Sequence, residues 1–326
     1  MAMGRRDMMT ATVMAAGAAA IQASGPKPAA AAAPRAGGQA PGFYRFMVGE
    51  HEVTLVNDGV FRRPLEAGFV GNAPLEEVQR ALEEAFQPPD ELTIPITSMV
   101  VNTGDRLILV DAGTGGLLAP TAGLWMENFR AAGYTPEQVD LIVVSHFHGD
   151  HVQGIRGQDG NAVFPNAALM VPEAEWAFWM DEGQMSRAPE AMQGAFQGVR
   201  RVFAPVAGEV ERYTGERELL PGLTALPAPG HTPGHTAFVL ASGEDRLLIW
   251  SDTTNKPELF VRNPDWQAAF DMDGDQAAAT RRRLLDMAAT ERMPVAGYHF
   301  PFPATGHIAR GDDGFRFVPA FWQPAA

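Results

Sequence analysis

The chain lacks cysteine altogether and has only two lysines, Lys27 and Lys256, among its 326 residues. Without cysteine, no disulfide can stabilise the fold and no thiol can act as a nucleophile or a metal ligand. A metal ion would therefore have to be bound by histidine, aspartate or glutamate. Basic residues are also scarce, because 25 Lys and Arg stand against 39 Asp and Glu, a formal net charge of −14. This balance argues against a nucleic-acid partner, since binding to the phosphate backbone needs a basic surface.

The first 42 residues differ in composition from the rest of the chain. Arg5 and Arg6 precede an apolar stretch, residues 8–21, that is too short to span a bilayer. A charged start followed by a short apolar run is typical of an export signal, and the paired arginines resemble a twin-arginine signal. Residues 24–42 are rich in Ala, Pro and Gly and predict a flexible leader. We therefore expect a periplasmic or secreted protein without a membrane anchor; a disordered Ala-rich tail is the alternative.

Residues 43–326 predict a single domain of the α/β class, in which strands come first and then alternate with helices. Alternating or continuous apolar runs predict strands at 44–48, 52–57, 97–102, 106–110, 141–144, 223–226, 237–240, 246–250 and 294–296. Apolar residues at helical spacing predict helices at 74–86, 124–132, 173–180, 189–202 and 275–290. Three consecutive arginines, 281–283, lie on the last of these helices and are interpreted as a solvated face.

Most of the eight histidines fall in short clusters, each just after a predicted strand. His146, His148, Asp150 and His151 follow the buried strand 141–144 within six positions. Residues two apart in an extended segment point the same way, so His146 and His148 can reach one cation together. Asp150 and His151 come after Gly149, where the chain can turn, and would face a second position nearby. Imidazole and carboxylate together suit zinc or a similar divalent metal.

This His-x-His-x-Asp-His cluster resembles the signature of the metallo-β-lactamase superfamily, whose fold is a four-layer αββα sandwich. The resemblance implies two divalent metals, most simply Zn²⁺, on two ligand sets: His146, His148 and His231 for one metal, Asp150, His151 and His299 for the other, and Asp252 bridging the pair. Asp111 resembles a structural aspartate near the site. His235 stands where the superfamily keeps a histidine that supports the site without binding metal.

Several further segments narrow the resemblance to methyl parathion hydrolase and its exported relatives. They are residues 42–45, 101–104, 131–140 and 314–319. Those relatives are dizinc hydrolases, usually homodimers, that act on lactones, aryl esters and organophosphate triesters. The resemblance implies that a hydroxide shared by the metals attacks the substrate, with Asp252 positioning both metals and Asp150 orienting the nucleophile.

The substrate pocket is less well defined by the sequence. By the same resemblance Trp179 and Phe196 would wall a leaving-group pocket, although core packing is an equal alternative, and Phe69 could line its mouth. Asn255 stands three residues after Asp252, where acyl-homoserine lactonases carry a tyrosine. The loop 64–72 lacks the arginine of the parathion-degrading enzyme. These departures favour a promiscuous esterase and lactonase acting on a small ester or lactone. A zinc β-lactamase is the alternative, weakened because such enzymes carry a different residue in place of Asp252.

Overall fold

The computed structural model describes residues 37–311 and 314–324. The described residues from Ala40 onward form one compact unit, which holds all the strands and helices named below. The predicted export signal and most of the predicted leader, residues 1–36, lie outside the described residues. Within the described part of the chain, no helix is both long and apolar enough to cross a membrane.

The described strands form two seven-stranded sheets. The first sheet follows the order of the chain: β1 (Phe43–Val48), β2 (His51–Pro64), β3 (Glu91–Asn102), β4 (Leu107–Val110), β5 (Leu141–Val143), β6 (Ala168–Pro172) and β7 (Glu211–Tyr213). The second sheet runs from β14 back to β8: β14 (Phe315–Pro319), β13 (Thr305–Arg310), β12 (Val295–Gly297), β11 (Asp245–Ser251), β10 (Thr236–Ser242), β9 (Leu223–Pro227) and β8 (Arg217–Leu220). Strands β4 to β7 pair in parallel, as do β11 and β12, and the other neighbours are antiparallel.

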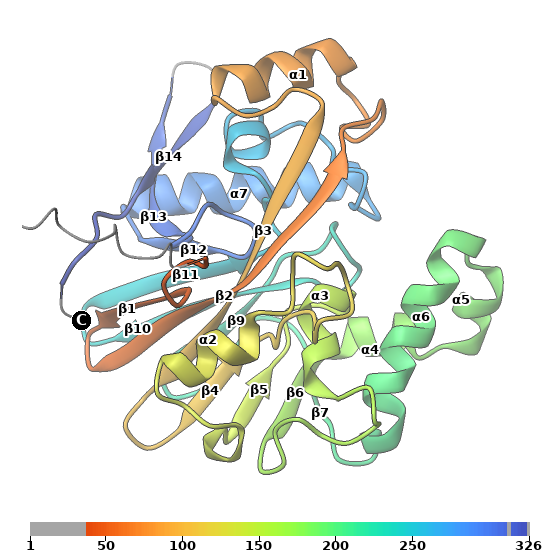
Figure 1. The fold of residues 1–326 in the computed structure, drawn as a ribbon, viewed down its shortest axis with the longest axis vertical. Coiled ribbons are helices and arrows are strands. Elements are labelled where there is room, and N and C mark those ends of the chain that lie inside the picture. The colour runs from red at the N-terminus through yellow and green to blue at the C-terminus, as the bar shows by residue number, and fades with distance from the viewer. Residues whose placement is uncertain (1–36, 312–313, 325–326) are drawn as a thin grey trace, which may run out of the picture. The chain divides into compact units, whose positions relative to one another are not determined.

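Helices cover the outer face of each sheet. One core cluster joins the first sheet to α2 (Trp125–Ala131), α4 (Glu173–Trp179) and α6 (Glu190–Phe203), and another joins the second sheet to α7 (Gly274–Glu291). A third cluster fills the space between the sheets, where Val53 and Val101 pack with Phe238 and Leu247. Helix, sheet, sheet and helix therefore form four layers (Figure 1), which confirms the predicted αββα sandwich.

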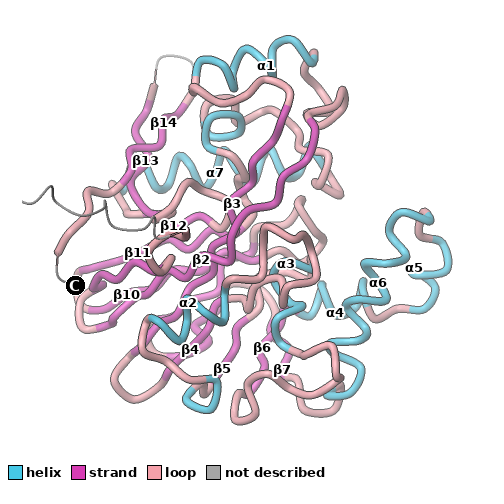
Figure 2. The backbone as a smooth tube through the Cα atoms, viewed as in Figure 1, coloured by secondary structure: helices cyan, strands magenta, loops and turns pink. Residues whose placement is uncertain are grey.

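Strands β2 and β3 extend well beyond the predicted 52–57 and 97–102 and run together toward α1 (Leu75–Glu84), as Figure 2 shows. The register of β2 against β3 shifts between Asn57 and Gly59, which is where the predicted strand 52–57 ended. Gly59 has φ of 108°, and a Cβ there would lie 2.3 Å from the carbonyl oxygen of Thr121. A β-bulge at Gly59 therefore breaks the alternation of apolar and polar residues in the sequence, while the strand itself continues.

Other differences from the predicted elements arise where local signals are weak. Strands β6, β7, β8, β13 and β14 and the short helices α3 (Gly149–Val152) and α5 (Glu182–Arg187) were not predicted. The interpretation of all three arginines as a solvated face is wrong for Arg281, which is 1% exposed, while Arg282 and Arg283 are exposed. A charged run on a helix cannot show which member turns toward the protein.

Four loops bring the histidine clusters to one edge of the sandwich. Residues 144–152 follow β5 of the first sheet, and residues 228–235, 252–256 and 298–304 follow β9, β11 and β12 of the second. The site is thus built jointly by both sheets, as expected where strand ends meet at an edge.

Candidate metal centre

The seven residues predicted as metal ligands lie together at this edge. Their ligand atoms form three groups, each with all atoms within 4.8 Å of one another: His146, His148 and His231; His146, His151 and Asp252; Asp150, His151 and His299. The first and third groups coincide with the two sets implied by the sequence resemblance. Asp252 lies between them, since its Oδ2 is 3.4 Å from His231 Nε2 and 3.0 Å from His299 Nε2.

Hydrogen bonds on the far side of each ring orient these histidines. His151 Nδ1 donates to Asp111 Oδ2 at 2.8 Å, and His299 Nδ1 donates to the carbonyl of Pro95 at 2.7 Å. His231 Nδ1 lies 2.9 Å from Asp271 Oδ1. Each of the three bonds directs Nε2 toward the centre of the site. Such partners fix the tautomer and the ring orientation of a histidine that binds metal.

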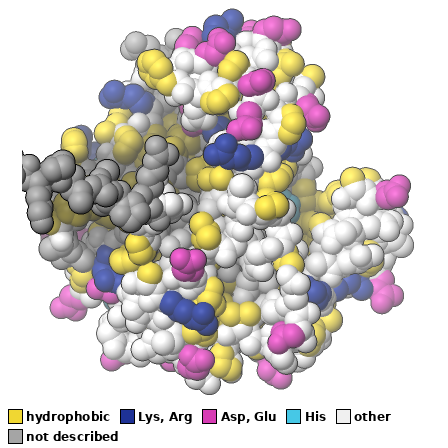
Figure 3. Space-filling model, viewed as in Figure 1, with side chains coloured by type: hydrophobic (Ala, Val, Ile, Leu, Met, Phe, Trp, Pro, Cys, Tyr) yellow, Lys and Arg dark blue, Asp and Glu magenta, His cyan; other side chains and the backbone are white. Residues whose placement is uncertain are grey.

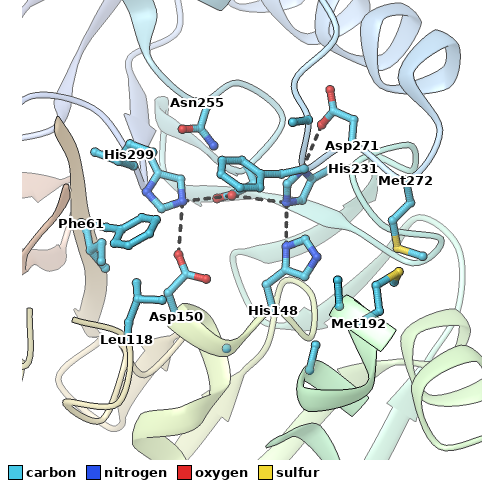
Figure 4. A pocket seen from close by; sticks show the side chains of 18 of the residues that line it. Phe61, Leu118, His148, Asp150, Met192, His231, Asn255, Asp271, Met272 and His299 are labelled. Atoms are coloured by element: carbon cyan, nitrogen blue, oxygen red, sulfur yellow. Dashed lines mark hydrogen bonds and ion pairs between the residues drawn. The ribbon is translucent and has the colours of Figure 1, made fainter. Parts of the chain in front are cut away.

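His146 and His148 complete the ring of nitrogens. His146 Nδ1 lies 3.0 Å from the hydroxyl of Ser145, which leaves Nε2 facing the site. His148 instead presents Nδ1, which lies 2.9 Å from His231 Nε2 (dashed in Figure 4). Because these two ring nitrogens lie so close together, His148 and His231 could bind the same cation.

Three inward-facing atoms at the centre are buried and have no hydrogen-bond partner among the described residues: His146 Nε2, His151 Nε2 and Asp252 Oδ1, of which the last two face each other at 3.3 Å. Leaving a buried polar group unpaired costs roughly 1–3 kcal/mol, and more for a charged group. All three are good ligands for a divalent cation of the zinc type. The residues of the site therefore fit such an ion.

The electrostatics of the cluster keep two histidines neutral. Burial, and then repulsion from neighbouring imidazoles, holds the pKa of His146 and His148 well below the usual range. Burial opposes charge on His151 as well, but Asp252, Asp150 and Asp111 outweigh it and raise its pKa. For Asp252, the histidines His299 and His151 outweigh burial and lower the pKa. Neutral imidazole and ionised carboxylate are the forms that bind metal, so His146, His148 and Asp252 favour the ligand form. His151 would have to release a proton when it binds a metal.

Asp111 and His235, predicted to support the site, both contact it without entering the ligand groups. Asp111 accepts bonds from the backbone and the hydroxyl of Ser145 as well as from His151, and its φ is 62°, rare for a residue other than glycine. His235 Nδ1 donates to the carbonyl of Ala228, and its Nε2 accepts the backbone N–H of Asp252 at 3.0 Å. Burial and the nearby His231 lower the pKa of His235 to about 3, which is consistent with this neutral tautomer.

A cavity of about 400 Å³ opens onto the ligand cluster. Figure 3 shows a histidine in a hollow with hydrophobic side chains around its rim. Figure 4 shows the ligands at its centre, with Phe61 and Leu118 on one side and Met192 and Met272 on the other. The lining is mostly apolar and includes no lysine or arginine among the described residues.

The four predicted substrate-contacting residues occupy different positions. Trp179 lines the cavity, with its ring 6.0 Å from that of His148. Asn255 also lines it, and its Oδ1 is buried without a hydrogen-bond partner among the described residues. Phe196 lies behind Trp179 and is fully buried. Phe69 packs in a separate core cluster, behind Phe270, so neither Phe196 nor Phe69 forms part of the cavity wall.

Sequence reasoning missed a buried ion pair behind the site. Asp271 accepts from His231 through Oδ1 and from Arg281 through Oδ2 at 3.1 Å. Arg281 also donates to the carbonyl of Thr253, the residue after Asp252. One guanidinium thus holds both the partner of His231 and the chain next to Asp252. The only signal was that Asp271 stands in an acidic segment between predicted elements.

The fold and the ligand cluster define a class of proteins, and the comparison with known families agrees. Residues 92–299 match the profile described as the Metallo-beta-lactamase superfamily, so the chain belongs to this superfamily. With the ligand groups intact, it is a metal-dependent hydrolase of this superfamily.

Individual relatives are similar over most of the domain. An N-acyl homoserine lactonase of a Bacillus species is 23% identical over 261 residues, which cover 74% of this chain and 92% of the relative. A probable metallo-hydrolase of Mycobacterium tuberculosis is 30% identical over 176 residues, 47% of this chain and 55% of the relative.

Two solved structures share the whole arrangement of the domain. AidC, a dizinc quorum-quenching lactonase in complex with a product, superimposes with a TM-score of 0.82 and 25% identity over 86% of this chain and 98% of its own. The hydrolase AbOPH, of the beta-lactamase superfamily, gives a TM-score of 0.81 and 28% identity over 88% of this chain and 100% of its own.

Proposed function

We propose that this chain hydrolyses neutral lactones and aryl esters, and organophosphate triesters as a further class, with two Zn²⁺ ions in its active site. The observation that carries the proposal is the convergence of seven candidate ligand side chains at the foot of a mostly apolar cavity, whose described lining contains no Lys or Arg. The lactonases and the dizinc enzyme among its relatives support the same chemistry.

Each of the two ligand sets would hold one metal ion. His146, His148 and His231 would hold one ion, and Asp150, His151 and His299 the other, with the carboxylate of Asp252 between them. Two such ions supply Lewis acidity and lower the pKa of the attacking water. Asp150 is the most open of the carboxylates, with 18% of its side chain exposed, and its Oδ2 lies 3.4 Å from His299 Nε2. Its carboxylate can therefore accept a hydrogen bond from a water in the cavity and orient it.

The cavity wall favours an uncharged substrate with apolar groups. Trp179 closes one side of the cavity next to His148. The amide of Asn255 has no partner for its oxygen within the described chain, so it is available to bind a polar group of the substrate. We assign it this role where related acyl-homoserine lactonases have a tyrosine. A neutral ester can bind against this apolar wall without burying a charge. Burying an unpaired charge would cost free energy.

The composition of the cavity also argues against the β-lactamase alternative. A β-lactam antibiotic carries a carboxylate, and the described residues of the lining include no Lys or Arg to pair with it. We therefore expect the purified chain to hydrolyse nitrocefin far more slowly than it hydrolyses a lactone. Strong nitrocefin turnover would contradict the proposal.

The direct test of substrate class compares kcat/KM over one panel. Dihydrocoumarin, p-nitrophenyl acetate, an acyl-homoserine lactone and a phosphotriester are assayed with the zinc-loaded chain. We expect the lactones and aryl esters to rank first. A phosphotriester as the best substrate would place the enzyme closer to the parathion-degrading branch, and no turnover of any member would overturn the proposal.

Export and assembly are proposed from the sequence alone. The paired arginines and the short apolar run support export by the twin-arginine route, which carries folded proteins, and the resemblance to methyl parathion hydrolase supports a homodimer. Fractionation of cells that express the full chain tests the first proposal, and light scattering of the purified protein tests the second.

A further inference from the structure

Glu175, in helix α4, is a fully buried carboxylate that does not belong to the ligand set. Burial raises its pKa. Among the described residues it pairs with no Lys, Arg or His; instead it accepts three N–H groups. Oε2 accepts the backbone N–H of Phe147 at 2.8 Å and the indole N–H of Trp179 at 3.0 Å, and Oε1 accepts the backbone N–H of Gly234 at 2.7 Å.

Each of these three donors belongs to the active site. Phe147 lies between His146 and His148, on the loop that follows the first sheet's β5. Gly234 lies just before His235, on the loop between β9 and β10 of the second sheet. Trp179 lines the cavity. A single carboxylate therefore connects the two loops that supply the first ligand set, and connects both to the cavity wall.

The contact is too close for any other residue at position 234. A Cβ on Gly234 would lie 2.5 Å from the backbone nitrogen of Glu175 and 2.9 Å from its Cγ. Backbone cannot yield to such an overlap as a flexible side chain can. The loop that carries His231 is thus packed directly on α4, so that a shift of Glu175 would move it.

We propose that Glu175 is a positioning residue that sets the spacing between the His146–His148 loop and the His231 loop, and with it the binding of one of the two metal ions. This inference rests on the proposed two-metal function. Asp150, His151 and His299 make no bond to Glu175. His151 and His299 are instead held by Asp111 and by the carbonyl of Pro95, so the second ligand set is expected to keep its affinity. A buried acid that served only the stability of α4 would show no such selectivity.

The test replaces Glu175 by glutamine and measures zinc affinity by competition with a chromogenic chelator. Glutamine offers one acceptor oxygen, and its amide group would face a backbone N–H, so one of the two loops loses its partner. We expect one zinc site to weaken roughly 10- to 100-fold while the other stays unchanged. Asp58→Asn is the matched control, because Asp58 is also a buried carboxylate that accepts backbone N–H groups, but on the segment 114–125.

The outcomes separate the two proposals. A wild-type chain that takes up no zinc would overturn the proposed function itself. A wild-type chain with two zinc ions and an E175Q variant with unchanged affinities would overturn only the positioning role, as would equal losses in E175Q and D58N. Trp179→Phe removes one donor to Glu175 and part of the cavity wall but leaves both loop bonds, so it should raise KM without changing zinc affinity.

A measurement on the metal-free wild-type chain keeps the inference testable should E175Q fail to fold. Phe147 and Gly234 lie in loops, yet both amides donate to a buried carboxylate. Their amide protons should therefore exchange slowly with solvent, as strand amides do. Rapid exchange at both positions would show that Glu175 does not hold the loops.

Discussion

At the scale of single residues, the site depends on which nitrogen of each histidine faces inward. Asp111, Asp271 and the carbonyl of Pro95 each bind one ring nitrogen and leave the other for a metal. Four of the candidate ligands stand in one short cluster after a strand, and the resemblance to the superfamily implied the other three. Asp271 and Glu175 could not be predicted, because nothing local distinguishes a carboxylate that turns inward from one that faces water.

Replacing His148 by alanine removes one ligand of the first set. We expect hydrolysis of p-nitrophenyl acetate to be abolished, because the remaining nitrogens of His146 and His231 hold a zinc ion weakly. The circular dichroism spectrum should be unchanged. His307→Ala is the matched control, since His307 is exposed and lies outside the cavity. Near-full activity of His148→Ala would mean that the assigned metal site is wrong.

At the scale of elements, loops after strands of both sheets carry the ligands, and helices behind them fix the loops. The alternating and apolar runs of β1, β5 and β9 to β12 predicted these strands closely. The prediction ended β2 at Asn57 because the bulge at Gly59 resembles a turn, and it began β3 at Thr97 rather than at Glu91. The segment 253–272 had no predicted structure, since it is held by the side chain of Arg281 on the following helix α7 rather than by its own pattern.

Arg281→Met should destabilise this segment strongly. It leaves Asp271 buried without its cation, which costs about 3–5 kcal/mol when one partner of a buried pair is removed. Urea denaturation measures the loss of unfolding free energy. Arg282→Met is the control, because the exposed pair of Arg282 with Asp265 contributes about 0–1 kcal/mol. Equal, small losses in both variants would contradict the anchoring role of Arg281.

Helix α6 forms one side of the cavity through Ala191, Met192 and Ala195. Ala195→Trp should fill part of the roughly 400 Å³ space and raise KM for a long-chain acyl lactone about 10-fold or more, with little effect on p-nitrophenyl acetate. Gln197→Trp places the same ring on an exposed position of α6 and should leave both substrates unaffected. If Ala195→Trp left the KM of the long-chain substrate unchanged as well, the acyl group of that substrate would have to bind outside this part of the cavity.

At the scale of the whole molecule, the two sheets meet at the candidate metal centre. His146, His148, Asp150 and His151 come from the first sheet, while the other three ligands come from the second. A bound ion would therefore link the halves of the sandwich. The sequence resemblance predicted this architecture because the clusters follow strands in a fixed order along the chain.

The stability of the chain should consequently rise with free zinc. A ligand that binds only the folded state adds RT ln(1 + [L]/Kd), about 4 kcal/mol at a thousand times Kd. Thermal denaturation at increasing zinc concentrations should show a rising midpoint in the wild type and a smaller rise in His148→Ala. A midpoint independent of zinc would mean that the folded chain does not bind it.

The central claim is that two metal ions on these seven ligands drive hydrolysis of a neutral ester bond. Its most direct test is a titration of the chelator-stripped chain with zinc while the initial rate of dihydrocoumarin hydrolysis is followed. The rate should rise from near zero and reach a plateau at about two equivalents of zinc per chain. A rate that is already full without metal, or that stays at zero with excess zinc, would contradict the claim.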